Sequence, residues 1–430
     1  MFIRTDLSDK LIHFVRAVNR ESNDYMLSEM HSYEFAFGEL VEEDKISPFF
    51  ILRRIIRKLQ VLSTWSYRNG SSTIRGNYPV TCFTDMPISA FVATSIDRLS
   101  KGQKISNYAL VFDKKQMFAI GARPVIYGAT KNEALPETEK YRFVAYDPTS
   151  LPYAIDWTHE REWRWANFDY ISKMIPQQDF SDEDHPLEEY TLELMRLRDE
   201  ERIEFHGLNL DKQPLSNIGF ILKTKEQARL ILRDILWLID QGKISANLFT
   251  YILFFSDLQA NPDSIQDPKF INDLISNGRI EIAPYLIIDK HKQREVIAKL
   301  AELSSSLMER FNPDEFPGGI TGISFPCFND NLSQAARLLV GTAYVKITKL
   351  GRYLLNLPCL NQTQSLELNE QFVIDIVNPQ LSNILETPLT YYSVGSLSRA
   401  PISQIGLNDI PFYTEPNDDE WNEAHREEDF

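Results

Sequence analysis

Cysteine is scarce in this sequence of 430 residues, which has only Cys82, Cys327 and Cys359, far apart along the chain. Such an odd, scattered set argues against a disulfide framework and against a cysteine-based zinc site. The seven histidines form neither an HExxH motif nor a pair at metal-ligand spacing. We therefore expect no structural metal.

Long apolar runs are also missing. No segment approaches the roughly 20 consecutive apolar residues that cross a bilayer, although 43% of the residues are hydrophobic. The N-terminal stretch MFIRTDLSDK is interrupted by Asp6, Asp9 and Lys10, unlike a secretory signal. These absences predict a globular, cytoplasmic protein that does not associate with a membrane.

The familiar nucleotide-enzyme motifs are absent as well. The sequence has no P-loop, GxGxxG, GxSxG or kinase signature, and it has no internal repeat or low-complexity segment. At 430 residues the chain is too long for one ordinary hydrophobic core. Two domains of roughly 150–220 residues are the natural expectation.

Charge is distributed unevenly. The net charge is −16, but residues 179–204 carry eleven acids against three arginines, and residues 415–430 carry eight acids against one arginine. The rest of the chain is therefore close to neutral. Residues 49–84, in contrast, have no acid and six basic residues, namely Arg53, Arg54, Arg57, Lys58, Arg68 and Arg75. An excess of one sign favours a ligand of the other, so this segment suggests an anionic ligand.

The N-terminal half reads as a mixed α+β domain. Ser47-Pro48 is typical of a helix start, and the following residues place leucine and isoleucine on one face and four basic side chains on the other. A strand at 79–84, a helix at 87–99 and strands at 108–112 and 124–127 should follow. Asp113 and Gly121 should begin and end a short helix between the last two strands.

The acidic stretch 179–204 marks the boundary between the halves. Beyond it we expect a helix from Thr224 to Gly242, a strand at 280–288, a helix at 290–311 and a strand-rich region over 318–394. The predicted organisation is therefore a domain at 1–178, an acidic linker or helix at 179–204, an α+β domain at 205–414 and a disordered acidic tail at 415–430.

The stretch WTHEREWRW, Trp157 to Trp165, concentrates tryptophan and charge in nine positions. Read with a period of two it is a strand, with Glu160, Glu162 and Arg164 on one face and the tryptophans, His159 and Arg161 on the other. One interpretation is a sheet face that lines a cleft, where Arg164 keeps Glu162 or Glu160 ionised. The other is a half-solvated strand with a salt bridge across strands.

Two further motifs have two interpretations each. His13, among apolar neighbours in IHFVR, is either a hydrogen-bonded structural histidine or part of a site. The segment CFTDMP, Cys82 to Pro87, lies at a change from strand to helix. There, backbone N–H groups can receive an anion, or Asp85 can simply cap the helix.

Several of these pieces together resemble a known family. LIHFVRA, STIRG, VTCFTDMPI, GARPVIYG, KYRFVAYDP and DWTHEREWRW, spread over residues 11–170, are similar in order and spacing to the AbiGi-type abortive-infection family of bacterial phage defence. Its layout, with an early strand carrying histidine, a central strand carrying an aromatic residue and a late strand carrying glutamate, resembles ADP-ribosyltransferases. The resemblance thus implies an ADP-ribosyltransferase-like fold for residues 1–178 and a cytoplasmic transferase that uses NAD.

Carried over to this sequence, the resemblance assigns roles to individual residues. His13 would bond the ribose or nicotinamide part of NAD, and Glu162, supported by Arg164, would accept a hydrogen bond from the ribose 2′-hydroxyl. Arg68 or Arg75 would meet the pyrophosphate. Tyr108, Tyr127 and Phe83 are all candidates for the aromatic position, with Tyr127 assigned to the cofactor site. The target would be a nucleic acid or a protein.

Two other functions are compatible with the sequence. The chain is alternatively a non-enzymatic antitoxin or sensor subunit, which binds a defence-system partner or a phage trigger protein through the strand-rich C-terminal half and the acidic tail. A metal-dependent nuclease built on Asp85, Glu160 and Glu162 is the third reading, although the spacing of these acids does not match the usual nuclease motif.

Overall fold

The computed structural model confirms the mixed α+β class. The structure describes residues 7–19, 45–68, 71–101, 105–128, 135–151, 154–168, 207–260, 264, 267–308, 320–348 and 351–396. These residues divide into two compact units. The first comprises the described residues up to Thr224 together with Asn247–Arg279, and the second comprises Lys225–Ala246 and the described residues from Ile280 onward.

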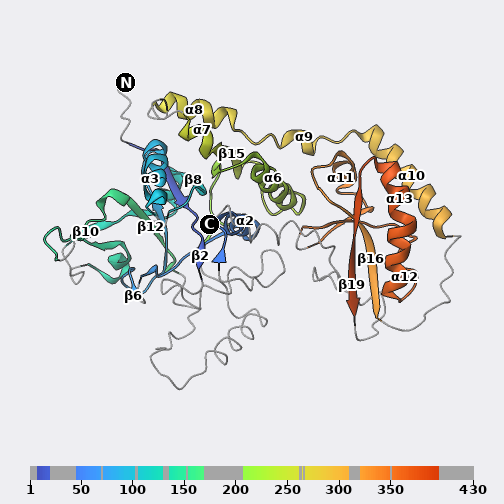
Figure 1. The fold of residues 1–430 in the computed structure, drawn as a ribbon, viewed down its shortest axis with the longest axis horizontal. Helices are drawn as coiled ribbons and strands as arrows, with labels where there is room; N and C mark the ends of the chain where they lie inside the picture. The colour runs from blue at the N-terminus through green and yellow to red at the C-terminus, as the bar shows by residue number, and fades with distance from the viewer. Residues whose placement is uncertain are drawn as a thin grey trace, which may run out of the picture. The chain divides into compact units, whose positions relative to one another are not determined.

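A seven-stranded sheet forms the centre of the first unit (Figure 1). In spatial order its strands are β15 (Phe249–Phe254), β14 (Ile218–Leu222), β8 (Ala109–Asp113), β1 (Lys10–Phe14), β7 (Val80–Thr84), β12 (Glu162–Ala166) and β9 (Arg123–Pro124). All neighbours are antiparallel except β14 and β15, which are parallel. Two strands of this sheet thus come from beyond the acidic segment 179–204, which itself lies outside the described residues.

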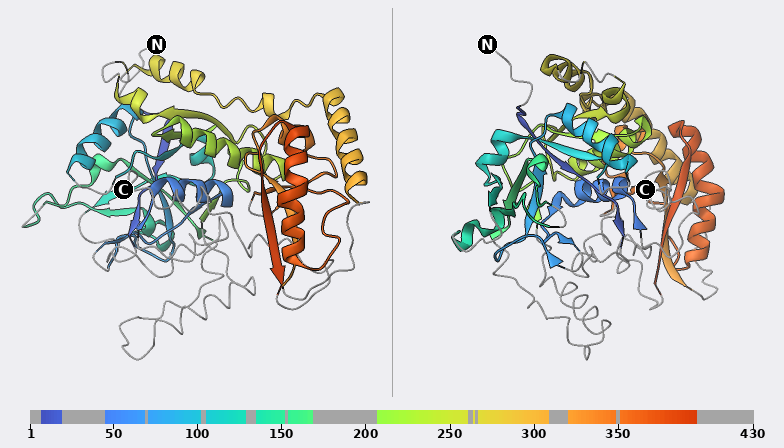
Figure 2. Two further views of the ribbon diagram at one scale, coloured as in Figure 1. Left: turned by 45° about the vertical axis from the view of Figure 1, so that its right-hand side comes forward. Right: turned by 60° about the vertical axis from the view of Figure 1, so that its left-hand side comes forward.

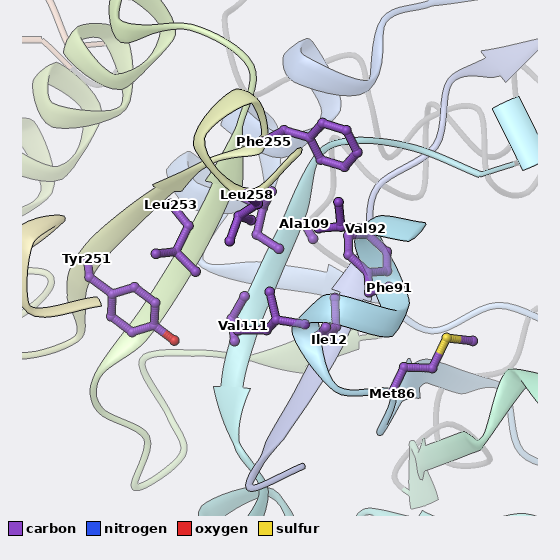
Figure 3. Close-up of a cluster of buried hydrophobic side chains, with 12 residues drawn as sticks. Ile12, Met86, Phe91, Val92, Ala109, Val111, Tyr251, Leu253, Phe255 and Leu258 are labelled. Atoms are coloured by element: carbon purple, nitrogen blue, oxygen red, sulfur yellow. The ribbon is translucent and has the colours of Figure 1, made fainter. Parts of the chain in front are cut away.

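One face of this sheet carries an apolar cluster. Side chains of β1, β8, β14 and β15 meet those of α3 (Ile88–Ser100), α7 (Phe255–Gln259) and α8 (Pro268–Asn277). Figure 3 shows Ile12 and Val111 among the helix residues Phe91, Val92 and Leu258. Burial of large aliphatic and aromatic side chains stabilises the sheet by about 1.5–3 kcal/mol for each of them.

Helix α2 (Pro48–Lys58) begins where the sequence predicts, because the Ser47 hydroxyl accepts the backbone N–H of Phe50 at 3.1 Å. Its basic residues, however, are mostly buried. Arg53, Arg54 and Arg57 are buried, and Lys58 alone of the four basic residues is exposed. Three of the four basic side chains that could meet an anionic ligand therefore lie inside the protein.

Shorter elements complete the first unit. Four pairs of short strands are β2 (Val18–Asn19) with β3 (Lys45–Ile46), β4 (Gln60–Leu62) with β13 (Gly207–Asn209), β5 (Tyr67–Arg68) with β6 (Ser71–Ser72), and β10 (Ile126–Gly128) with β11 (Phe143–Ala145). The helices are α4 (Lys114–Ala119) and the 3₁₀ segments η1 (Glu137–Arg142) and η2 (Thr158–Glu160). Asp113 caps α4 as predicted, with its carboxylate accepting the N–H groups of Lys115 and Gln116 at 3.0 Å.

The stretch Trp157–Trp165 is only half a strand, which corrects the prediction. Asp156 accepts hydrogen bonds from the Thr158 backbone at 2.9 Å and hydroxyl at 2.6 Å and so starts the turn of η2. Arg161 then adopts a left-handed conformation, with φ of 46°. Alternation of side chains consequently begins at Glu162, not at Trp157.

The second unit contains a four-stranded antiparallel sheet, in the order β17 (Val345–Ile347), β18 (Tyr353–Leu355), β16 (Thr321–Phe328) and β19 (Leu389–Ser396). A helical stretch made of α12 (Leu366–Gln371), the π-helical η5 (Phe372–Val377) and α13 (Asn378–Leu385) contacts β16 and β19. Figure 2 shows this helix and α10 (Lys290–Met308) beside the sheet. The remaining helices are α6 (Lys225–Asp240), α9 (Ala283–Leu286) and α11 (Gln334–Leu339).

The predicted helix from Thr224 is confirmed by α6, and Gly242 follows its end with φ of 67°. The strand expected at 280–288 is wrong. Pro284 lies in the first turn of α9, where its fixed φ suits a helix and its missing N–H costs nothing. None of the described helices is both long enough and apolar enough to pass through a lipid bilayer.

Candidate functional site

The two strands that carry His13 and Glu162 lie on either side of β7. Ile12 of β1 is opposite Thr84 of β7, and Thr84 is in turn opposite Glu162 of β12. The strand between them therefore contributes Phe83 as its aromatic residue. Of the three aromatic candidates, Tyr108 is instead buried against Phe49, with ring centroids 5.8 Å apart.

Charged and polar groups surround Glu162. Arg164 donates from Nε to Oε1 of Glu162 at 2.8 Å and from Nη2 to Oε2 at 3.1 Å. The Nη1 atom of Arg164 also donates to the carbonyl oxygens of Tyr141 at 2.6 Å and Phe143 at 3.1 Å. The Arg164 side chain is 4% exposed and that of Glu162 is 20% exposed. A buried guanidinium with four hydrogen bonds thus holds a carboxylate that solvent can still reach.

Residues directly opposite one another on antiparallel strands point to the same face of a sheet. Cys82 is opposite Arg164, and Thr84 is opposite Glu162. The face that carries Ile12 and the apolar cluster therefore continues at β12 as a polar region. Its members are Cys82, Thr84, Glu162 and Arg164.

The Cys82 thiol lies within this polar region, on the same face as the Glu162 carboxylate. Burial, and next the negative charge of Glu162, raise the pKa of Cys82 far above the ordinary thiol value. Because the thiolate is the reactive form of cysteine, Cys82 is a poor nucleophile here.

Tyr127, at the middle of β10, is also a neighbour of Glu162. Its hydroxyl donates to the Trp157 carbonyl oxygen at 3.1 Å. Burial raises the pKa of Tyr127, the carboxylates of Glu162 and Glu160 raise it further, and a hydrogen bond with the Glu162 backbone opposes them. Tyr127 is therefore a neutral hydroxyl near Glu162, and its role in binding NAD stays a prediction.

Glu160, only two residues before Glu162, has a different partner. Its carboxylate accepts from Arg98 Nη1 of α3 at 2.8 Å, and its backbone carbonyl accepts from the Thr84 hydroxyl at 2.7 Å. These contacts fix the turn that leads into β12. Of the two acids proposed as partners of Arg164, the structure pairs it with Glu162.

His13, a residue of β1, contacts the neighbouring strand β7. Its Nδ1 atom lies 2.8 Å from the Cys82 carbonyl oxygen, and its ring centroid lies 5.7 Å from that of Phe83. A carbonyl oxygen can only accept, so Nδ1 carries the proton and Nε2 is a bare acceptor in the neutral ring. Burial lowers the pKa of His13 to about 4, and the charge of Arg16 lowers it too. His13 is consequently uncharged at neutral pH.

The structure does not place His13 and Glu162 on one face. Ile12 shares its face with Thr84 and Glu162, and successive residues of a strand point to opposite faces. His13 therefore points away from the face of Glu162. The region around Glu162 is made by Arg164, Cys82 and Tyr127 without it.

The two arginines expected at the pyrophosphate are less well defined. Arg68 belongs to β5, but its side chain lies outside the described part of the chain. Arg75 is exposed in the turn between β6 and β7, next to Gly76, whose φ is 82°. Neither has a described contact with Glu162, so their role in binding NAD stays a prediction.

Asp85 has a structural role that neither interpretation of the CFTDMP segment anticipated. It does not cap α3, whose N-cap is Pro87 and lacks a side-chain cap. Its carboxylate accepts from Arg161 Nε at 2.7 Å, from Lys114 Nζ at 2.8 Å and from Trp163 Nε1 at 3.2 Å. Burial would raise the pKa of Asp85, but the hydrogen bonds and charges of Lys114 and Arg161 lower it overall.

The three acids of the nuclease interpretation do not converge. Asp85 is paired with Lys114 and Arg161, and Glu160 and Glu162 are each paired with their own arginine. Within the described ranges, no group of three His, Cys, Asp or Glu side chains could hold a metal ion.

The sequence does not identify Arg98 and Lys114 as partners of the acids. Arg98 is 62 residues from Glu160, and Lys114 is 29 residues from Asp85. No local spacing signals such pairs.

Comparison with protein-family models, curated proteins and solved structures finds no match to this chain.

Proposed function

We propose that the first unit is an NAD-dependent ADP-ribosyltransferase that acts in bacterial defence against phage. One observation carries the proposal: the partly exposed Glu162 carboxylate is held in place by the buried Arg164 through two hydrogen bonds of 2.8 and 3.1 Å. The resemblance of residues 11–170 to the abortive-infection family supports the assignment to phage defence.

The chemistry requires a fixed carboxylate. When the bond between nicotinamide and ribose breaks, its electron pair leaves with nicotinamide, and positive charge develops at the ribose C1′ and ring oxygen. A carboxylate that accepts a hydrogen bond from the 2′-hydroxyl interacts more strongly with this state than with ground-state NAD. An acceptor nucleophile of the target then bonds to C1′ and loses its proton.

Glu162 can perform this task while bound to Arg164. A carboxylate has about four lone-pair positions, and the two hydrogen bonds from the guanidinium use one on each oxygen. The remaining positions are available to a ribose hydroxyl. Arg164 is a positioning residue in this proposal, because its donors are directed at Glu162 and at two backbone carbonyls.

His13 contributes less to the proposal than Glu162. Its bare Nε2 suits a ribose hydroxyl or a carboxamide N–H as donor, but its strand position points it to the other face. Tyr127, which borders Glu162 directly, is the stronger candidate for a second contact with NAD.

The test measures transfer of label from radioactive NAD to macromolecules in a lysate of phage-infected cells. The full chain is compared with Glu162→Gln, which keeps the shape of the side chain and removes its charge. A matched control is Glu295→Gln, the same change at an exposed position of α10, where the side chain is 54% exposed.

Transfer by the wild type and by Glu295→Gln, with a loss of at least about a hundredfold in Glu162→Gln, is the expected result, since removal of one fixed transition-state contact typically costs that much. Absence of both transfer and nicotinamide release in the wild type would exclude the enzyme. The chain would then have to act by binding a partner.

A further inference from the structure

A second surface feature lies where α4 meets the edge of the seven-stranded sheet. We call it the aromatic–cation patch, and it consists of Lys114, Phe118, Arg123, Arg161 and Trp163. None of these residues has a part in the proposed transfer chemistry. In β12, Trp163 lies between Glu162 and Arg164 and therefore points to the opposite face from them.

The patch is contiguous. The guanidinium carbon of Arg123 lies 4.0 Å from the ring centroid of Phe118, and that ring lies 6.5 Å from Trp163 in an edge-to-face arrangement. Nζ of Lys114 lies 5.1 Å from the Trp163 ring. Arg161 joins through Asp85, whose two oxygens bind Arg161 and Trp163 at 2.7 and 3.2 Å.

The side chains of the patch remain open to solvent. Phe118 is 51% exposed, which is unusual for a phenylalanine, and Arg161 and Lys114 are 34% and 24% exposed. Asp85, the acid that binds three of the patch residues, is 13% exposed and lies beneath them. Lys114, Arg123 and Arg161 carry three positive charges, and Asp85 carries one negative charge. The formal charge of these four side chains together is therefore +2.

Two backbone carbonyl groups hold the Arg123 side chain in place. Its Nη1 donates to the carbonyl oxygens of Phe118 at 2.7 Å and Ala122 at 2.8 Å, which holds the guanidinium over the phenylalanine ring. In the part of the chain that the structure describes, Arg123 has no carboxylate partner, and its positive charge is available to an anion.

We propose that the aromatic–cation patch binds a single-stranded nucleic acid. The exposed Phe118 ring, next to the partly buried Trp163 and to three cations, matches what such a strand offers, since a base stacks on an exposed ring and phosphates approach the cations. The positive patch on an otherwise acidic protein complements that ligand in charge. An acidic peptide would use the cations but would place no ring on the exposed part of Phe118.

This inference does not rest on the proposed transfer reaction, because binding is measured without NAD. The experiment follows fluorescence anisotropy of a labelled oligo-dT of about twelve nucleotides, a length within the usual site size. It uses the full chain at low salt, with inorganic polyphosphate and poly-glutamate as competitors.

Two variants test the two halves of the interaction. Phe118→Ala should weaken binding about tenfold, because it removes one stacking surface. Arg123→Gln should weaken it as well and should reduce the dependence of the logarithm of affinity on the logarithm of salt by about 1. Circular dichroism and thermal melting show whether each variant is folded.

Matched controls are Leu151→Ala, an apolar side chain that is 90% exposed, and Lys101→Gln, a cation that is 57% exposed. Both should bind as the wild type does. Unchanged binding by folded Phe118→Ala would overturn the proposal, as would equal competition by polyphosphate and oligo-dT at the same charge, which would show a simple polyanion site. Absence of binding to oligo-dT at low salt would overturn it too.

Discussion

Glu160 and Glu162 are two residues apart in the chain, and each is held by a different arginine. Arg164 could be predicted as the partner of Glu162 because both lie on the same face of one strand, and the structure confirms this ion pair. Arg98 could not be predicted as the partner of Glu160, since the contact depends on where α3 packs. The ion-pair partner of a residue can thus be predicted from spacing in the sequence only when the two residues lie close together in the chain.

The positioning role of Arg164 leads to a first prediction. In Arg164→Lys the compact ammonium cannot make two parallel hydrogen bonds to the Glu162 carboxylate. We expect kcat for NAD turnover to fall about tenfold to a hundredfold with little change in KM. Steady-state kinetics measures this, and Arg98→Lys, the same change at the arginine that binds Glu160, is the control. An equal loss in both variants would contradict a specific role for Arg164.

The environment of His13 leads to a second prediction. Its pKa of about 4 lies well below the value of 6.5 expected in an unfolded chain. Between these values the unfolded chain binds a proton that the folded protein does not, so stability is fully present above pH 6.5 and decreases as the pH falls toward 4. The loss is on the order of 3 kcal/mol.

NMR of the histidine ring signals measures this directly, with His13→Gln to identify the signal of His13. The signal should titrate near pH 4. A midpoint close to 6.5 would show that the ring is solvated and would remove the argument that His13 is neutral because it is buried.

At the scale of single elements, the main departure from prediction is the entry into β12. The tryptophans of WTHEREWRW suggest alternation from Trp157 onward, but the Asp156–Thr158 hydrogen bonds and the left-handed Arg161 replace the first half of the strand by a turn. Regular patterns elsewhere are confirmed, as in α2, β7, α3 and α6, because apolar periodicity decides their structure. A single side chain that competes for backbone hydrogen bonds is enough to override such periodicity.

The close approach of β14 and β15 allows a prediction about the sheet. A Cβ atom added at Gly219 would lie 2.1 Å from the ring of Tyr251. We therefore expect Gly219→Ala to lower the free energy of unfolding by about 1–3 kcal/mol, measured by urea denaturation. The ring is the obstacle, so adding Gly219→Ala to Tyr251→Leu should cost less than adding it to the wild type. Equal costs in the two backgrounds would show that the glycine is needed for another reason.

At the scale of the whole molecule, the sequence predicts the α+β class. It does not predict which strands share a sheet or in what order they lie. Residues 179–204 suggest a boundary between two domains, whereas β14 and β15, which follow that segment, belong to the same sheet as β1. Strand order depends on long-range pairing, and a single sequence carries little information about it. The acidic segments themselves lie outside the described residues, so their predicted roles stay predictions.

The distribution of charge over the whole chain leads to a fourth prediction, which depends on the aromatic–cation patch. Deletion of residues 415–430 removes a net charge of −7 and leaves −9 on the protein. Less repulsion should tighten oligo-dT binding by about twofold to fivefold at 20 mM salt, and the gain should disappear near 200 mM, where the Debye length is under about 8 Å. Anisotropy titrations at both salt concentrations measure it. A gain that persists at high salt would indicate instead that the tail covers the patch.

The central claim is that Glu162 makes this protein an NAD-consuming enzyme. Its most direct test is the release of free nicotinamide from NAD by the full chain in a lysate of phage-infected cells, for the wild type beside Glu162→Gln and Glu295→Gln. The account predicts release by the wild type and by Glu295→Gln and at least about a hundredfold less by Glu162→Gln. Equal release by all three proteins, or none by the wild type, would contradict it.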